Sequence, residues 1–178
     1  KPDNLFIERM VSHLSAFRDI APTFVVLGNH DNHSGREQWL QAFKSSSLTF
    51  IENQVLSPKP GICLRGLGDY SSGYYTPIEW PENCESSTKI TLTHDPYAAF
   101  ADNASGIVLA GHTHCGQIRL PFIGAPWTPT KAPVEAQCGK FSDDHKILIV
   151  TGGLNTSMIP IRIGTTPQWN LIQLAPPF

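Results

Sequence analysis

Short apolar runs and amphipathic segments alternate along this chain of 178 residues. Residues 3–18 carry an apolar side chain every three or four positions from Ile7 to Phe17. This spacing predicts an amphipathic helix, for which Asp3 or Asn4 is a suitable N-cap. The chain therefore opens on a helix that buries one face.

Two further helices and seven strands follow from the same pattern. Ser34 should cap a short helix whose inner face carries Trp39 and Phe43, and Asp95-Pro96 is an N-cap followed by proline at the first helical position. Strands are predicted over residues 23–27, 48–51, 63–67, 89–93, 106–110, 146–151 and 169–174, with loops over 71–87 and 121–139. This alternation predicts a single α/β domain over residues 1–178.

Three of the predicted strands run directly into histidine-containing motifs. These are Gly28-Asn29-His30-Asp31, His94-Asp95 and Gly111-His112-Thr113-His114. Two imidazoles separated by one residue at the end of a buried strand cannot both point into a core. Neutral imidazole is a ligand for zinc, iron, manganese and nickel. Because open α/β sheets place their sites at the carboxyl ends of strands, the three motifs predict a metal site.

Composition and charge narrow the classes of function. The chain is 40% hydrophobic and 16% charged, which is typical of a globular protein. Its net charge of −2 gives no reason to expect nucleic acid as a partner. No apolar run is long enough to span a bilayer, and no signal peptide is visible. The four cysteines show no Cys-x-x-Cys spacing, so we expect free, mostly buried thiols. The thiol of Cys115, which follows His114, could lie near the metal, where it would be a candidate ligand.

The three motifs, in this order, resemble the last three motifs of the calcineurin-like metallophosphoesterases. Residues 114–122 and 158–162 further resemble the YaeI/YkuE-like bacterial branch of that family. The similarity runs from about Thr23 to Leu174. The resemblance implies the four-layer αββα sandwich of that family, here apparently without its first strands.

The resemblance also implies a role for each motif residue. It assigns His94, His112 and the amide oxygen of Asn29 to one divalent metal, and His114 to a second. Three neutral ligands would leave most of a dication's charge available to polarise phosphate and water. His30 would face the scissile phosphate and assist the leaving oxygen. Asp31 would orient and charge the His30 ring, and can cap a helix at the same time.

Two acidic motifs of the family are not found before Thr23. The dinuclear centre also uses an Asp-x-His and a Gly-Asp-x-x-Asp, whereas the single Gly-Asp pair here is Gly68-Asp69, in the wrong order. We therefore expect a missing N-terminal segment, and we expect the chain alone to be inactive or weakly active. It should bind at most one metal, unless Asp69 or Asp95 replaces the lost carboxylate.

The function implied is metal-dependent hydrolysis of a phosphodiester or pyrophosphate through a dinuclear centre. The substrate could contain a lipid or a nucleotide, the metals could be Mn, Fe, Zn or Ni, and a membrane surface is a possible partner. The alternative is a non-catalytic metal-binding or interaction remnant of the same fold. We expect a location in the cytoplasm or peripheral to the inner membrane.

Three other features could serve a phosphate site. Arg119 and Arg162 lie near the metal loops in sequence, and a guanidinium can bind phosphate oxygens in bidentate fashion. Both could equally be ordinary surface residues. The apolar segment 120–127 follows the last histidine motif and could either line a pocket for an acyl or aromatic group or pack as a loop on the core.

Overall fold

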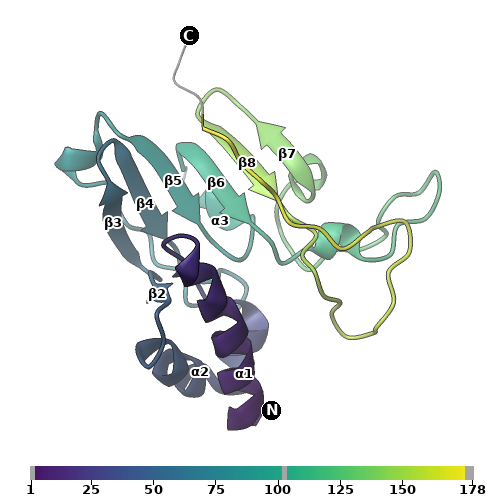
Figure 1. Cartoon of the computed structure of the whole chain (residues 1–178). Coiled ribbons are helices and arrows are strands. Elements are labelled where there is room, and N and C mark those ends of the chain that lie inside the picture. The colour runs from purple at the N-terminus through teal and green to yellow at the C-terminus, as the bar shows by residue number, and fades with distance from the viewer. Residues whose placement is uncertain (1–2, 102–103, 175–178) are drawn as a thin grey trace.

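A six-stranded mixed sheet forms the centre of the computed structural model, which describes residues 3–101 and 104–174 (Figure 1). The order of its strands is β3-β4-β5-β6-β8-β7. The four inner strands are parallel, and the two edge strands pair antiparallel to their neighbours. The strands are β3 (Gln54–Lys59), β4 (Ile62–Gly66), β5 (Thr88–Leu92), β6 (Gly106–Ala110), β7 (Gly139–Ser142) and β8 (Lys146–Val150).

The register of the inner strands brings the histidine motifs together. Leu92 of β5 pairs with Leu109 of β6, and Ala110 of β6 pairs with Val150 of β8. Because these strands are parallel, their carboxyl ends share one edge of the sheet. The residues that follow β5, β6 and β8 therefore start from neighbouring positions.

The two longest helices lie side by side next to β2, beyond the six-stranded sheet (Figure 1). They are α1 (Asn4–Ser15) and α2 (Asn29–Lys44), and the short strands β1 (Phe24–Val25) and β2 (Thr49–Phe50) form a separate parallel pair. Oδ1 of Asp3 accepts a hydrogen bond from the Phe6 amide at 2.7 Å, which confirms the predicted cap. Buried apolar side chains join these elements: Ile7, Val11, Leu27, Trp39, Phe43 and Leu48.

A second apolar core packs on the sheet. It joins strands β6 and β8 to the short helix α3 (Ala98–Ala101) through Val108, Leu148, Val150 and Ala99. As predicted, Asp95 precedes this helix, and its Oδ1 accepts from the Tyr97 amide at 2.9 Å. The mixed sheet flanked by helices confirms the predicted α/β class and is consistent with a metallophosphoesterase α/β sandwich.

Several element predictions are wrong. Residues 169–174 form no strand, and Trp169 and Leu171 are exposed, so these apolar side chains gain none of the burial that usually accompanies strand formation. Helix α2 begins at Asn29 rather than after Ser34. It has non-helical dihedrals at Gly35, so the sequence pattern revealed only its second half.

Two strands were missed. Strand β3 forms a hairpin with β4, and β7 forms one with β8. Their turns contain Pro60-Gly61 and Asp143-Asp144, which are ordinary turn signals. Both strands are short or largely exposed edge strands, so they lack the continuous apolar runs by which the inner strands were recognised.

The expectation of free thiols is also wrong. Cys63 pairs with Cys84, and Cys115 pairs with Cys138, with Cα–Cα distances of 5.8 and 4.7 Å. All four sulfurs are therefore used in disulfides. Spacing along the chain could not reveal these pairs, because the sheet and its loops bring the partners together. Within the described ranges, no helix is both long and apolar enough to cross a membrane.

Candidate metal centre

All three histidine motifs line one cavity of about 610 Å³ at the carboxyl edge of the parallel strands. The polar residues in its wall include Asn29, His30, Asp31, His94, His112 and His114. A larger groove of about 900 Å³ lies between α1 and α2, but its polar lining is of Ser, Gln, Glu and Asn side chains. The chemistry of the chain is therefore concentrated in the smaller cavity.

Three side chains meet at one point of this cavity. Nε2 of His94 is 3.0 Å from Oδ1 of Asn29 and 3.0 Å from Nδ1 of His112. The rings of His94 and His112 are edge to face, with centroids 4.8 Å apart. Two imidazole nitrogens and one amide oxygen thus converge, as the strand-end motifs predicted.

A carbonyl group fixes which nitrogen of the His112 imidazole is free. Nε2 of His112 lies 2.7 Å from the Pro129 carbonyl oxygen, and Nδ1 of His114 lies 3.0 Å from the Asn155 carbonyl oxygen. A carbonyl can only accept, so Nε2 of His112 carries the proton and donates, whereas Nδ1 of His114 also lies 3.4 Å from the donating Nη2 of Arg162. The lone pair of His112 is then on Nδ1, which faces Nε2 of His94 at 3.0 Å. Metal-binding histidines usually hold the other ring nitrogen in this way.

The loop that carries His112 and His114 has an unusual backbone. His112, His114 and Cys115 have φ values of 66°, 51° and 54°, in the left-handed region that non-glycine residues rarely adopt. Strained backbone of this kind persists where the surroundings enforce it. Here the Cys115–Cys138 disulfide and the hydroxyl of Thr113, which donates to the Gln137 carbonyl at 2.7 Å, tie the loop to the segment before β7.

The Arg162 guanidinium braces the same loop. It donates to the carbonyl of His114 at 3.3 Å and to that of Gly152 at 2.6 Å, and it also bonds the Asn155 carbonyl. The sequence suggested Arg162 and Arg119 as phosphate ligands. Neither is among the described residues that line the cavity, and Arg162 is committed to carbonyl oxygens. Its role here is to join the His114 loop to the segment after β8.

His30 and Asp31 also line the cavity and follow Asn29 in the first turn of α2. Nε2 of exposed His30 is 3.1 Å from Oγ of Ser157. Oδ2 of Asp31 accepts from the Gly28 amide at 2.9 Å, so this carboxylate closes the start of the helix. Burial raises the pKa of Asp31, partly offset by the Gly28 hydrogen bond and the His30 charge.

Gly28 makes room for the His94 ring. A Cβ at residue 28 would lie 2.7 Å from Cε1 of His94 and 2.8 Å from its Nδ1. The glycine is therefore required by close packing of the two strand ends. Burial, and next the neighbouring His112, lower the pKa of His94 to about 4. Burial also lowers the pKa of His114. Both effects favour the neutral imidazole, which is the form that binds metal.

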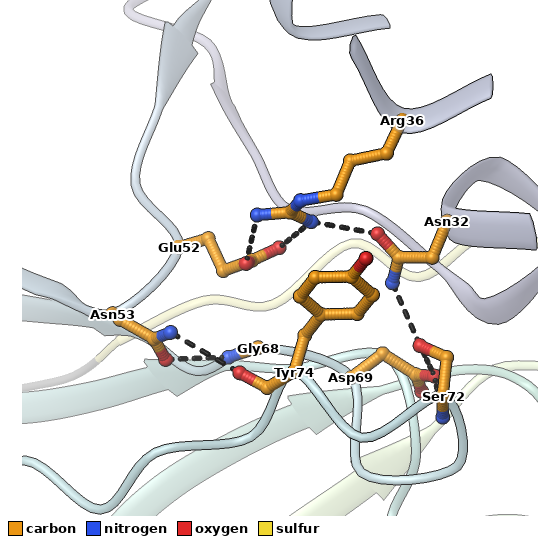
Figure 2. Close-up of polar contacts among 8 residues, drawn as sticks. All are labelled: Asn32, Arg36, Glu52, Asn53, Gly68, Asp69, Ser72 and Tyr74. Atoms are coloured by element: carbon orange, nitrogen blue, oxygen red, sulfur yellow. Dashed lines mark hydrogen bonds and ion pairs between the residues drawn. The ribbon is translucent and has the colours of Figure 1, made fainter.

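A polar network fixes the turn that carries Asn29 and His30 (Figure 2). Arg36 forms a bidentate ion pair with buried Glu52, at 2.6 and 3.1 Å, and donates to Oδ1 of Asn32 at 2.6 Å. Nδ2 of Asn32 donates to Oγ of Ser72, whose hydroxyl in turn donates to Oδ2 of Asp69 at 2.6 Å. The network ties the first half of α2 to the loop after β4.

The two carboxylates suggested as replacements for the missing motifs do not line the cavity. Asp69 accepts from the hydroxyls of Ser71 and Ser72, and Asp95 accepts from that of Thr130 at 2.6 Å. The disulfide also excludes Cys115 as a thiolate ligand. Across residues 3–101 and 104–174, no group of three or more His, Cys, Asp or Glu side chains is placed to hold a metal. The donor set contains two imidazoles, and only the amide of Asn29 completes three ligands.

Several residues near the cavity were not found from the sequence. The segment 155–159 contributes Ser157 to the wall, and Gln117 holds that segment through three hydrogen bonds. The only available signal was the polar run Asn155-Thr156-Ser157 in otherwise apolar sequence. The other three histidines do not line the cavity: His13 and His33 are exposed, and His145 lies in the β7–β8 turn.

Comparison with known proteins gives several relatives that are named phosphodiesterase or metallophosphoesterase, although no family model matches the chain. Phosphodiesterase YaeI of Escherichia coli (strain K12) is 29% identical over 170 residues, which are 90% of this chain and 61% of that protein. The uncharacterized metallophosphoesterase Cj0846 of Campylobacter jejuni is 35% identical, over 66% of this chain and 33% of that protein. The uncharacterized metallophosphoesterase YkuE of Bacillus subtilis is 34% identical, over 48% and 30%. The chain spans between about a third and three fifths of these relatives' lengths.

Proposed function

Because the chain belongs to the calcineurin-like metallophosphoesterases, we propose that its cavity hydrolyses a phosphodiester or pyrophosphate with the help of divalent metal ions. One observation carries the proposal. Nε2 of His94, Nδ1 of His112 and Oδ1 of Asn29 converge at 3.0 Å, and a carbonyl bond to the other ring nitrogen leaves the lone pair of His112 free. Neutral donors arranged in this way suit a divalent cation.

We assign each residue of the cavity a role in metal binding or in proton transfer. Asn29, His94 and His112 hold one ion, and His114 is offered to a second. The bound cation would polarise the phosphate and lower the pKa of a water molecule. His30 lines the same cavity, and its imidazole would donate a proton to the leaving oxygen. Asp31 keeps the His30 turn in place through its bond to the Gly28 amide.

The alternative is a metal-binding remnant without catalysis. The four assigned ligands, Asn29, His94, His112 and His114, include no carboxylate, and one imidazole alone does not hold a second divalent ion. The 178-residue chain should therefore bind at most one ion, weakly, with almost no turnover. The longer relatives leave room for further ligands in a full-length protein, where two ions and turnover are expected. Metal analysis of the 178-residue chain and of the full-length protein distinguishes a metal-dependent hydrolase from a non-catalytic remnant.

The decisive experiment combines metal content with hydrolysis of an aryl phosphodiester by the full-length protein. His112→Ala should remove both metal and turnover, because it deletes a ligand with a free lone pair. His13→Ala is the matched control, since that imidazole is exposed on α1. Turnover that persists in metal-free protein, or that is lost equally in both variants, would refute the proposal.

An apolar wall favours a substrate with a hydrophobic group. Trp127, Met158 and Ile159 line the cavity beside the metal ligands, and Trp127 and Met158 are 68% and 91% exposed. Phe122 is fully exposed on the same loop as Trp127. Apolar surface of this kind at a cavity mouth is suited to an acyl chain or an aromatic ring.

Replacing Phe122 and Trp127 together by Ser tests this substrate class. Hydrolysis of a lipid-like diester should fall several-fold more than that of a small aryl diester, because only the former buries apolar surface on the loop. An equal loss on both substrates would mean that the loop only supports the fold.

A further inference from the structure

A segment without regular secondary structure reaches across the cavity to His30. Oγ of Ser157 lies 3.1 Å from Nε2 of His30, although the two residues are 127 positions apart. Ser157 is half-buried and lines the cavity, while its neighbour Met158 is almost fully exposed. The hydroxyl therefore contacts the histidine that the proposed function uses as proton donor.

A single side chain holds Ser157 in this place. Oε1 of Gln117 accepts from the Ser157 amide at 2.7 Å, and Nε2 of Gln117 donates to the carbonyls of Ser157 and Ile159 at 3.1 Å each. The Gln117 carbonyl accepts from the Ile163 amide and from Oγ1 of Thr165, both at 3.0 Å. Gln117 thus makes the bonds that a neighbouring strand would otherwise supply.

Gln117 also belongs to the loop that carries the metal-binding histidines. It follows His114 by three residues, and its amide donates to the His114 carbonyl at 2.9 Å. A displacement of this loop would move Gln117, and through it Ser157. Hydrogen bonds from Gln117 to Ser157, and from Ser157 to His30, therefore connect the loop to His30.

We propose that Ser157 is a positioning residue that directs the His30 ring into the cavity, and that Gln117 sets the position of Ser157 relative to the metal loop. This inference rests on the proposed function, because it concerns the leaving-group step assigned to His30. An exposed imidazole on a helix turn has several rotamers of similar energy. A hydrogen bond to Nε2 selects the one that points toward the substrate, and the hydroxyl can give way when a leaving oxygen binds.

The test compares leaving groups in the full-length, metal-loaded protein. A good leaving group such as nitrophenolate needs little help from an acid, whereas an alkoxide does. Ser157→Ala and Gln117→Ala should lower hydrolysis of an alkyl phosphodiester by about tenfold, the usual weight of one hydrogen bond, and that of a nitrophenyl diester by much less. Ser157→Thr, which keeps the hydroxyl, should restore most of the loss. Metal content should not change.

The neighbouring hydroxyl provides the control, since Thr156→Val should leave the ratio of the two rates unchanged. Equal losses on both substrates in Ser157→Ala, or loss of metal, would overturn the inference by assigning Ser157 a purely structural role.

A second readout does not need activity. In protein labelled with ¹⁵N-histidine, the ring signals of His30 at one fixed pH should move in both Ser157→Ala and Gln117→Ala, while those of His94 stay in place. Unmoved His30 signals would refute the inference whatever the activity. If the wild type hydrolyses no phosphoester but the His30 signals move, the proposed function fails and the positioning contact stands.

Discussion

The turn that carries Asn29 and the loop that carries His112 face the same cavity but are held by different interactions. The turn is anchored by charge: Arg36 and buried Glu52 fix the first half of α2. The loop is anchored by a disulfide from Cys115 and by Arg162, which bonds main-chain carbonyls. The turn keeps ordinary helical geometry, whereas the loop has φ values above 50° at three non-glycine residues.

The turn and the loop form two walls of the cavity, and the difference in how they are held reflects the side chains that each wall directs into the cavity. The turn offers one amide oxygen and one imidazole from consecutive residues of a helix, so side-chain bonds to that helix suffice. The loop offers two imidazoles separated by one residue, and its backbone must bend sharply to do so. A strained backbone relaxes unless it is held at several points. A covalent link and carbonyl bonds act on the backbone itself.

The largest expected effect is on turnover, and it tests whether the helical turn serves catalysis through His30 while the ligands hold the metal. His30→Ala on the helical turn should lower turnover by about 10²–10⁴-fold, the usual weight of general acid catalysis, with metal content nearly unchanged. The measurements are steady-state kinetics and metal analysis of the full-length protein. Loss of metal in this variant would show that the turn binds the ion through His30.

The next effect concerns the ionic anchor of the turn. Arg36→Met leaves Glu52 buried without its partner and should cost about 3 kcal/mol of unfolding free energy, measured by urea denaturation. Lys146→Met is the matched control, because its partner Asp143 stays in water and the loss should be much smaller. Similar losses in both variants would mean that burial of Glu52 does not set the strength of this anchor.

The covalent anchor of the loop can be compared with a second disulfide that lies away from it. Replacing Cys115 and Cys138 by Ser, or Cys63 and Cys84 by Ser, opens bonds with separations of 23 and 21 residues. Each change should therefore cost a similar amount of stability, about 2–3 kcal/mol. Only the first pair should also weaken metal binding, measured by titration calorimetry. Equal metal affinity in both would show that the loop holds its shape without the bond.

The smallest effect arises where the two walls meet. The pKa of His94 is lowered to about 4, mainly by burial, from the ordinary value of 6.5. The unfolded chain therefore takes up this proton first, and the stability that neutral His94 contributes is present above pH 6.5 and lost as the pH falls toward 4. Urea denaturation of metal-free protein from pH 7 to 4 measures the decline. A His94→Gln variant with an equally steep decline would assign it elsewhere.

The sequence was informative about the parallel part of the sheet and its site. Strands β6 and β8 are largely apolar runs, and β5 carries Ile90 and Leu92 among polar residues. Residues after parallel strands share an edge, so the meeting of His94 and His112 could be predicted. Edge strands β3 and β7 lack such runs and were missed. The interactions that shape the site escaped prediction because they join distant residues: Cys115 to Cys138, Arg162 to the His114 carbonyl, and Ser157 to His30.

The strand register described above has a consequence for how this chain can vary in evolution. Leu92 of β5 pairs with Leu109 of β6. His94 comes two residues after Leu92, and His112 comes three residues after Leu109. Inserting or deleting one residue between either pair member and its histidine would displace the ring by about 3.3 Å, the rise of one extended residue, away from the point where the three side chains meet. Side chains within these strands can therefore be exchanged for others of similar volume, but their lengths cannot change. Length variation should instead collect at the β3–β4 and β7–β8 turns, none of whose residues lines the cavity.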